Sequence, residues 1–375
     1  MLVGLDCRAI GPGATGIGAF AKAALHSLAG SLPPGALAVV VRRGMVLTAK
    51  VPRPMPMIED PGTDPLWYEL ELPAALEEHG VGLFFSPLFT CPVVHTARQV
   101  VTIHDVFPET HANLCTPEFA RFWSHRVGPA MRAGCHAVTV SEWSKSQVVE
   151  RLRIAPERVS VVRQPAGRSF RPVAPEEARP VLEKHGLVRQ GYVLYVGAID
   201  PRKNLERLVR AFARTGCGDL VLAVAGQPTV EGYDLRRFAS EAGVEGKLRL
   251  LGHVADEDLP ALYSGARCFA FPSLAEGFGR PVIEAMACGT PVVASGHTAL
   301  PETCGGAALL PDAENEASIA DALRAACSDD PVRERLIEAG MRRAAEFTPG
   351  RFATDLAEAF RAAEAGMAEG LWPCA

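Results

Sequence analysis

The chain has 375 residues, of which 48% are hydrophobic and 22% charged, and its formal net charge is −5. This length allows two domains that each bury a core, and the acidic balance gives no reason to expect a nucleic-acid-binding protein. No apolar run is long enough to span a membrane, and residues 1–5 are typical of a strand and not of a signal peptide. The ten cysteines include no Cys-x-x-Cys pair, so we expect free thiols in a reducing, cytoplasmic compartment and no zinc site.

The first predicted elements are a strand at residues 2–5, a glycine-rich loop at 11–18 and a helix at 20–28. This order is typical of a nucleotide-binding βα unit. The spacing of the glycines departs from the strict Gly-x-Gly-x-x-Gly form, and the strand at 37–41 ends in Arg42-Arg43 without an acidic residue. Both features argue against a dinucleotide-dependent dehydrogenase. Residues 44–65 are rich in proline and methionine, and we expect them to form a mobile loop.

Strands are predicted at 81–86 and 99–103, and the second ends in His104 and Asp105. The ends of strands are where α/β proteins place ligand groups. His104 can bond a sugar hydroxyl or respond to a developing charge, and Asp105 is expected to orient His104 or the loop. A structural histidine bonded to a loop carbonyl is the alternative. After a strand at 137–140, Ser141 is placed to cap the next helix.

A helix predicted at 117–133 carries basic and aromatic side chains together, which suggests contact with a membrane surface. The plainer alternative is a half-buried helix on the sheet. We predict a first domain at 1–168, an interdomain linker at 169–190, a second domain at 191–351 and a final helix with a tail at 352–375. Both halves share a βαβ rhythm, which predicts an α/β protein with two Rossmann-like domains.

The second domain opens with a strand at 192–196, followed by Gly197, Ala198 and the pair Arg202-Lys203. Two cations at the carboxyl end of a strand, beside a helix start, are suited to hold a diphosphate. Solvent exposure is the alternative for such a pair in a turn. A later strand, at 248–251, is followed by Gly252-His253-Val254.

The most informative stretch is 273–295, which predicts a loop, a helix, a turn and a short strand. Gly277 and Gly279 let the backbone approach a ligand, and the start of the helix favours an anion such as a diphosphate. Glu276 suits the hydroxyls of a sugar, and Glu284 suits the paired hydroxyls of a ribose. A solvated loop glutamate and a surface helix glutamate are the alternatives for these two residues.

The sequence Glu-Gly-Phe-Gly-x-Pro-x-x-Glu-Ala-Met-Ala-x-Gly-x-Pro-Val-Val at 276–293 resembles the donor-site signature of the retaining nucleotide-sugar glycosyltransferases of family 4. The resemblance covers nearly the whole chain. It implies the GT-B fold, in which two Rossmann-like domains face each other across a cleft and the C-terminal helix crosses back to the first domain. Many members carry arginine where this chain has Ala198, so the charge on the diphosphate is expected to rest on Arg202 and Lys203.

The resemblance also implies the residues of the site. In the family, the glycines after the first strand lie beneath the sugar and phosphate, and the turn at 252–254 packs on the base. The predicted catalytic residues are His104, Arg202, Lys203 and Glu276. The predicted donor-binding residues are Gly16, Gly18, Gly197, Gly252, His253, Val254, Gly277, Phe278, Gly279 and Glu284, and the predicted orienting residues are Asp105 and Ser141.

Residues 102–108, Thr-Ile-His-Asp-x-x-Pro, resemble a subgroup rich in mannosyltransferases. The expected reaction moves a sugar, with mannose first, from GDP-mannose or next a UDP-sugar to a hydroxyl of a saccharide, lipid-linked or small-molecule acceptor. Such a reaction serves polysaccharide, glycolipid or glycoside biosynthesis. The resemblance implies retention at the anomeric carbon.

No carboxylate nucleophile is evident in the first domain, which favours front-face attack assisted by the leaving phosphate. No aspartate-rich motif is present, so neither a metal nor a cofactor is expected. The alternatives are a nucleotide-sugar epimerase and a non-catalytic sugar-nucleotide-binding protein. We expect a cytoplasmic protein, with peripheral contact at the inner face of the membrane as an option.

Overall fold

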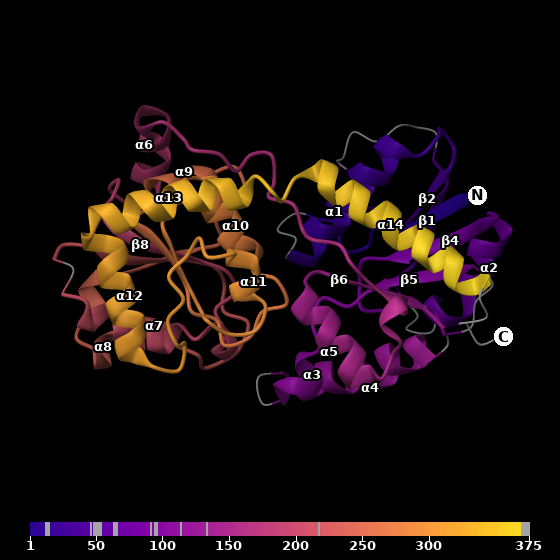
Figure 1. Cartoon of the computed structure of the whole chain (residues 1–375), viewed down its shortest axis with the longest axis horizontal. Coiled ribbons are helices and arrows are strands. Elements are labelled where there is room, and N and C mark those ends of the chain that lie inside the picture. Colours follow the sequence, from indigo (N-terminus) through magenta and orange to yellow (C-terminus); the bar gives the residue numbers. More distant parts are fainter. Residues whose placement is uncertain are drawn as a thin grey trace. The chain divides into compact units, whose positions relative to one another are not determined.

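The computed structural model describes residues 1–11, 16–45, 47, 55–62, 67–90, 92–93, 97–112, 115–132, 134–216 and 218–368, without the side chains of residues 119 and 366–368. The chain divides into two compact units. The first unit comprises Met1–Pro165 and Pro349–Ala375, and the second comprises Ala166–Thr348. Each unit is built on its own parallel sheet with helices around it (Figure 1).

The sheet of the first unit has seven strands in the order β3-β2-β1-β4-β5-β6-β7. Their bounds are β1 (Leu2–Asp6), β2 (Leu37–Arg42), β3 (Met57–Asp60), β4 (Val81–Ser86), β5 (Arg98–Thr102), β6 (His136–Thr139) and β7 (Val159–Val161). Most positions of these strands are buried, as expected for a parallel sheet covered on both faces. The strand order reverses between β1 and β4, and ligands of such sheets bind at the carboxyl ends of the strands near this point.

The helices of the first unit flank this sheet (Figure 1). They are α1 (Gly16–Ser31), α2 (Trp67–Glu78), α3 (Phe107–Thr110), α4 (Pro117–Arg132), α5 (Glu142–Leu152) and α14 (Pro349–Ala368). One hydrophobic cluster joins Val101 and Ala137 of the sheet to Trp123 of α4 and Val148 of α5. The α14 helix packs on α1 and β5, with Phe352 edge-on to Phe20 at 5.2 Å. The predicted return of the C-terminal helix to the first domain is therefore confirmed.

The sheet of the second unit has five strands in the order β10-β9-β8-β11-β12. Its strands are β8 (Tyr192–Val196), β9 (Val221–Ala225), β10 (Leu248–Gly252), β11 (Cys268–Phe271) and β12 (Val292–Ala294). Its helices are α6 (Pro175–Lys184), α7 (Leu205–Arg214), α8 (Leu235–Glu241), α9 (Leu259–Gly265), α10 (Arg280–Ala287), α11 (Leu300–Cys304), α12 (Glu316–Ser328) and α13 (Asp330–Ala344). The order reverses between the neighbouring strands β8 and β11, so the loops that follow these two strands meet.

The structure differs from the sequence-based expectations at three places. The α1 helix begins at Gly16 and not at residue 20, so Gly16 and Gly18 lie in its first turn, and residues 12–15 of the expected loop lie outside the described residues. The expected loop at 44–65 contains the edge strand β3, and much of the rest of it lies outside the described residues.

The third difference is the segment at 169–190, which was predicted to be a linker. It contains α6, which packs against α9 in the second unit. Pro175 stands at the start of this helix, where a missing N–H costs nothing, and Ala178 and Leu182 are its buried face. Its prolines and charges hid this short apolar face from the sequence analysis.

Candidate functional site

The loops after β8 and β11 are joined directly at their backbones. The Leu274 N–H donates to the carbonyl of Arg202 over 2.8 Å, and Nη1 of Arg202 donates to the carbonyl of Ala275, also over 2.8 Å. These bonds hold the segment with the two predicted cations against the segment that carries Glu276. Residues more than 70 positions apart in the sequence thus form one site, as the strand order requires.

An ion cluster of Lys203, Glu276 and Arg202 lies at the centre of this site. Nζ of Lys203 lies 2.5 Å from Oε1 of Glu276, and Nη1 of Arg202 lies 3.5 Å from Oε2. Lys203 and Glu276 are both buried. Burial alone raises the pKa of Glu276, but the charges of Lys203 and Arg202 outweigh it and lower the pKa below its ordinary value. Glu276 is therefore a carboxylate at neutral pH.

The pKa of Lys203 is lowered, first by burial and then by Arg202, while Glu276 opposes that shift. The cluster carries two positive charges against one negative. It can therefore accept a further anion without leaving a buried charge uncompensated.

Asn204 fixes the direction of the chain after the two cations. Its backbone is left-handed, with φ of 61°, a conformation that asparagine tolerates better than most residues. Its side-chain amide donates to the carbonyls of Pro272 (3.0 Å) and Ala313 (2.7 Å). In the turn before the two cations, Asp200 accepts a hydrogen bond from the N–H of Lys203 at 3.2 Å. Sequence analysis did not include Asn204 among the site residues, although an asparagine between a turn and a helix is a signal for such a cap.

Gly197 and Gly226 allow two strand ends to approach each other closely. Gly197 has φ of 151°, and a Cβ there would stand 2.7 Å from the hydroxyl of Tyr195. A Cβ on Gly226 would collide with the carbonyl oxygen of Gly197. Gly226 also donates its N–H to the carbonyl of Gly252 over 2.8 Å, which joins the ends of β9 and β10. Gly226 was not predicted, because its role depends on how neighbouring strands lie.

The start of α10 brings Gly279 and Glu284 into the site. Gly279 has φ of 90°, and a Cβ there would collide with the side chain of Leu300. Glu284 is only 3% exposed, and burial raises its pKa. Its Oε2 accepts from the hydroxyl of Tyr263 at 3.1 Å. Its Oε1 lies 2.5 Å from Nη2 of Arg280 in an ion pair, which opposes the effect of burial on the pKa.

The remaining predicted donor-binding residues differ in what they offer. Phe278 packs its ring against Phe347 at 5.5 Å, and its carbonyl accepts from Thr303, so its side chain belongs to the core. Only its backbone is available to a ligand. Gly252 has φ of 68° at the end of β10, His253 is exposed and Val254 is buried.

In the first unit, His104 is a buried, neutral histidine. Its Nε2 lies 2.9 Å from the carbonyl of Pro87, so this nitrogen carries the proton and donates. Burial lowers the pKa of His104 to about 4. Among the described residues, none bonds to Nδ1, which is therefore an acceptor. The alternative weighed from the sequence, a histidine bonded to a loop carbonyl, thus holds for one of its two nitrogens.

The two expected orienting residues, Ser141 and Asp105, accept hydrogen bonds from backbone N–H groups near His104. Ser141 caps α5 by accepting from the N–H of Ser144 at 3.0 Å, as predicted. The hydroxyl of Ser144 in turn donates to the carbonyl of His104 over 3.2 Å. Asp105 accepts from the N–H of Phe107 at 3.2 Å and so orients the loop. Ser144 was not singled out, since a serine inside a helix gives no distinct signal.

The described residues form no evident metal site and no membrane-spanning helix. Within these ranges no group of three or more His, Cys, Asp or Glu side chains is arranged to hold a metal ion. None of the described helices is both long enough and apolar enough to cross a bilayer.

The comparisons with known proteins agree with this geometry. Residues 181–343 match the family described as glycosyl transferases group 1. The chain is 32% identical over 290 residues to the O-antigen chain mannosyltransferase B of Escherichia coli, covering 76% of each protein. It is 28% identical over 288 residues to the serotype-specific mannosyltransferase WbdA of Escherichia coli, covering 72% of this chain and 35% of that larger protein. A solved structure of HepE from Anabaena, in complex with UDP and glucose, superposes with a TM-score of 0.76 at 17% identity and covers 96% of this chain and 99% of that one.

Two parallel sheets of Rossmann type, together with the likeness to HepE, define the GT-B fold. The chain belongs to the glycosyltransferase family of group 1. The predicted family and fold are confirmed.

Proposed function

We propose that the protein transfers mannose from GDP-mannose to a hydroxyl of a growing saccharide or lipid-linked acceptor, with retention at the anomeric carbon. The observation that carries the proposal is the buried cluster of Lys203, Glu276 and Arg202. The choice of mannose is supported by the likeness to two mannosyltransferases. UDP-sugars are the second class of donor, since HepE was solved with UDP and glucose. These relatives are glycosyltransferases, and they give the epimerase alternative no support.

The cluster supplies the charges that departure of a nucleoside diphosphate requires. When the bond to the anomeric carbon breaks, negative charge grows on the diphosphate oxygens and positive charge grows on the sugar. Arg202 and Lys203 stabilise the first, together with the start of α10. Each charge-assisted hydrogen bond contributes about 1.5–3 kcal/mol, which is roughly tenfold to a hundredfold in rate if it forms mainly in the transition state.

The two glutamates then take the hydroxyl groups of the donor. Glu276 is ionised and accepts from the hydroxyls of the sugar. Oε1 of Glu284, which also pairs with Arg280, accepts from a hydroxyl of the ribose. The turn of Gly252, His253 and Val254 packs on the base.

The side chain of His104 contributes a hydrogen-bond acceptor and carries no charge. With its proton on Nε2, Nδ1 presents a lone pair that accepts a hydrogen bond from a sugar hydroxyl. We propose that the acceptor attacks from the face that the diphosphate leaves and passes its proton to the departing phosphate oxygen. This course gives retention without a protein nucleophile.

We also propose that no divalent metal is needed. This is supported by Arg202 and Lys203, two cations that can neutralise a diphosphate without a metal ion. In about 10 mM EDTA we expect at least about half of the transfer rate to persist, because the two cations replace a metal ion. Loss of all transfer, with recovery on adding Mg²⁺ or Mn²⁺, would contradict this part of the proposal.

Peripheral contact with a membrane at the cytoplasmic face is part of the same proposal. It is supported by α4, which presents Phe122 at 40% exposure and carries Arg132 in its last turn. Sedimentation with vesicles that contain an anionic lipid tests it, and a protein that stays in the supernatant with every vesicle refutes it.

The function is tested with a panel of GDP-, UDP- and dTDP-sugars. Release of nucleoside diphosphate is measured with and without mixed acceptors, for the wild type and for Lys203→Ala. We expect release from GDP-mannose that rises with acceptor and falls at least about tenfold in the variant. If no donor binds and none releases nucleoside diphosphate, the proposed catalytic function is refuted, while the assigned fold is unaffected.

A further inference from the structure

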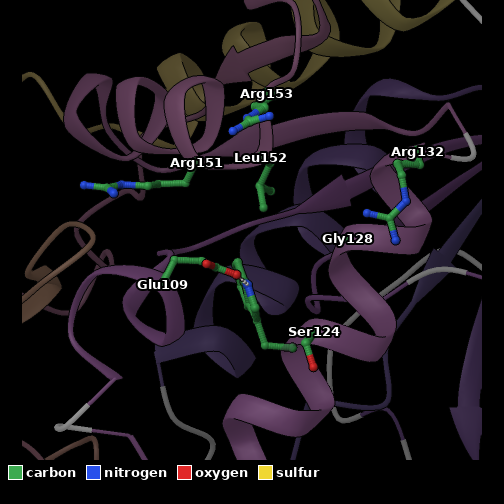
Figure 2. A pocket seen from close by; sticks show the side chains of 8 residues that line it. Glu109, Ser124, Gly128, Arg132, Arg151, Leu152 and Arg153 are labelled. Carbon is green, nitrogen blue, oxygen red and sulfur yellow. Dashed lines mark hydrogen bonds between the residues drawn. The ribbon is translucent and has the colours of Figure 1, made fainter.

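A pocket of the first unit lies between α3, α4 and the end of α5, away from the residues discussed so far. Its volume is about 290 Å³, at the lower end of the range of small-molecule sites. It is lined by Glu109, Trp123, Ser124, Gly128, Arg132, Arg151, Leu152 and Arg153. In Figure 2, Glu109 and Ser124 lie on one side and Arg151, Leu152 and Arg153 on the other, with Arg132 at the end of α4.

The lining is strongly cationic, with three guanidinium groups against one carboxylate. Arg151 has only a long ion pair to Glu150, at 3.8 Å and exposed. Within the described ranges, Arg132 and Arg153 have no carboxylate partner. The carboxylate of Glu109 already accepts from the indole N–H of Trp123 at 3.1 Å. Arg132 and Arg153 therefore have donors to offer to an anion, whereas the side chain of Arg151 extends away from Arg132 (Figure 2).

Two residues of this pocket stand at helix positions that disfavour their residue types. Gly128 stands inside α4, where glycine costs about 1 kcal/mol relative to alanine. A Cβ there would lie 3.3 Å from Nη1 of Arg132, so an alanine would displace that guanidinium slightly. Arg153 ends α5 in the left-handed region, with φ of 54°, a position that favours glycine. Both residues line the pocket.

A structural reason for Arg132 is not evident. Arginines near the end of a helix often bond its last carbonyls. In α4 that role falls to Arg158, whose Nη2 donates to the carbonyls of Met131 and Cys135, each over 2.8 Å. Arg132 is exposed and lies along the helix over Gly128.

The wall of the pocket continues to the candidate catalytic histidine. The ring of Trp123 packs edge-on against Phe89 at 5.7 Å, and Phe89 packs edge-on against His104 at 5.4 Å. Glu109 follows His104 by five positions and is bonded to the same Trp123. A ligand in the pocket is thus separated from His104 by two rings.

We propose that this pocket binds a phosphate group carried by the acceptor. Guanidinium groups match the geometry of phosphate and bind it through paired N–H donors. Glu109 and the hydroxyl of Ser124 suit neighbouring sugar hydroxyls. That the ligand is the acceptor rests on the proposed function, whereas the binding of phosphate rests on the arginines alone. The phosphate belongs either to a soluble phosphorylated saccharide or to a lipid headgroup.

The test uses the full-length protein with saturating GDP, so that the diphosphate site of the second unit is occupied. One arm measures the binding of mannose 6-phosphate by calorimetry, with mannose as the uncharged control. The other arm measures binding to phosphatidylcholine vesicles with and without phosphatidylglycerol. The variants are Arg132→Gln, Arg153→Gly and Gly128→Ala. Arg121→Gln is the matched control, because Arg121 lies on the same helix outside the pocket and pairs with Glu118 at 3.2 Å.

We expect the phosphate-bearing ligand of at least one arm to bind, and each pocket variant to weaken that binding about fivefold to tenfold relative to Arg121→Gln. Arg153→Gly and Gly128→Ala should at the same time melt at a higher temperature than the wild type, because each removes a helix-disfavouring feature. Weaker binding together with greater stability cannot result from damage to the fold. Binding in the first arm identifies a soluble source, and binding in the second arm alone identifies a lipid headgroup.

The proposal is overturned if the pocket variants bind as tightly as Arg121→Gln in both arms, or if mannose binds as well as mannose 6-phosphate and neutral vesicles as well as anionic ones. The two proposals fail separately. If the wild type releases no nucleoside diphosphate from any donor while the pocket variants still lose binding, the proposed function fails and the phosphate site stands.

Discussion

Replacement of Lys203 by methionine tests the ion cluster most sharply. The change keeps the length of the side chain and removes the charge that lies 2.5 Å from Glu276. Breaking a buried ion pair from one side costs about 3–5 kcal/mol, because it leaves the other charge unpaired. Arg202 remains 3.5 Å away on the other carboxylate oxygen, so we expect the lower end, about 3 kcal/mol.

Calorimetry can assign this loss to the second unit. The tryptophans among the described residues, at positions 67, 123 and 143, lie in the first unit, so their fluorescence reports on that unit. In Lys203→Met we expect one calorimetric transition to move to lower temperature while the fluorescence transition stays in place. Glu276→Gln removes the partner charge, and the double variant should then cost about 2 kcal/mol less than the sum of the two single variants.

The same variant shifts the dependence of stability on pH. The pKa of Glu276 is lowered in the folded protein, so its stabilisation is present above the ordinary pKa of glutamate and is lost as pH falls through the lowered value. Without Lys203, burial raises that pKa, and the loss on acidification should begin at a higher pH. Additive single and double variants, within about 0.5 kcal/mol, would refute the reasoning that the pair is coupled.

Three further predictions concern other parts of the two units. His104 should stay uncharged near pH 7, so an NMR titration of its imidazole should show a midpoint near 4 and not near 6.5. The contribution of the uncharged His104 to the stability of the fold is present above pH 6.5 and is lost as pH falls towards 4. Gly226→Ala should destabilise the second unit by about 3 kcal/mol or more in calorimetry, since the new Cβ would collide with the carbonyl of Gly197. In the control Gly246→Ala, the new Cβ would meet no atom within 4 Å, so we expect a loss of less than about 1 kcal/mol. Tyr263→Phe should weaken the binding of GDP by about fivefold to tenfold, because Glu284 loses its hydroxyl donor; unchanged affinity would argue against a ribose role for Glu284.

Most of the second unit could be predicted because its signals are local. A short apolar run predicts each strand, and a glycine marks the ends of β8, β9 and β10. Pro281 and Gly289 predict the bounds of α10 within about two residues. Glu276 and Lys203 could be named because the residues around them resemble a known signature. That they form one buried ion pair follows only when β8 and β11 lie side by side.

What the sequence did not show depends on distant parts of the chain. The need for glycine at 226 arises from the backbone of Gly197, and the burial of the Phe278 ring arises from Phe347. The short apolar face of α6 is recognisable only once α9 is present to cover it. The phosphate pocket likewise joins the ends of two helices whose arginines, taken singly, are typical of exposed helix ends.

The most direct test of the central claim is transfer of label from GDP-[¹⁴C]mannose to a mannose-terminated oligosaccharide. Wild type, Lys203→Met and the surface control Arg121→Gln are incubated under the same conditions, and the labelled product is isolated and its anomeric configuration determined. We predict labelled product of retained configuration from the wild type and the control, and at least about tenfold less from Lys203→Met. Equal transfer by Lys203→Met would contradict the claim that the buried cluster of the second unit holds the leaving diphosphate.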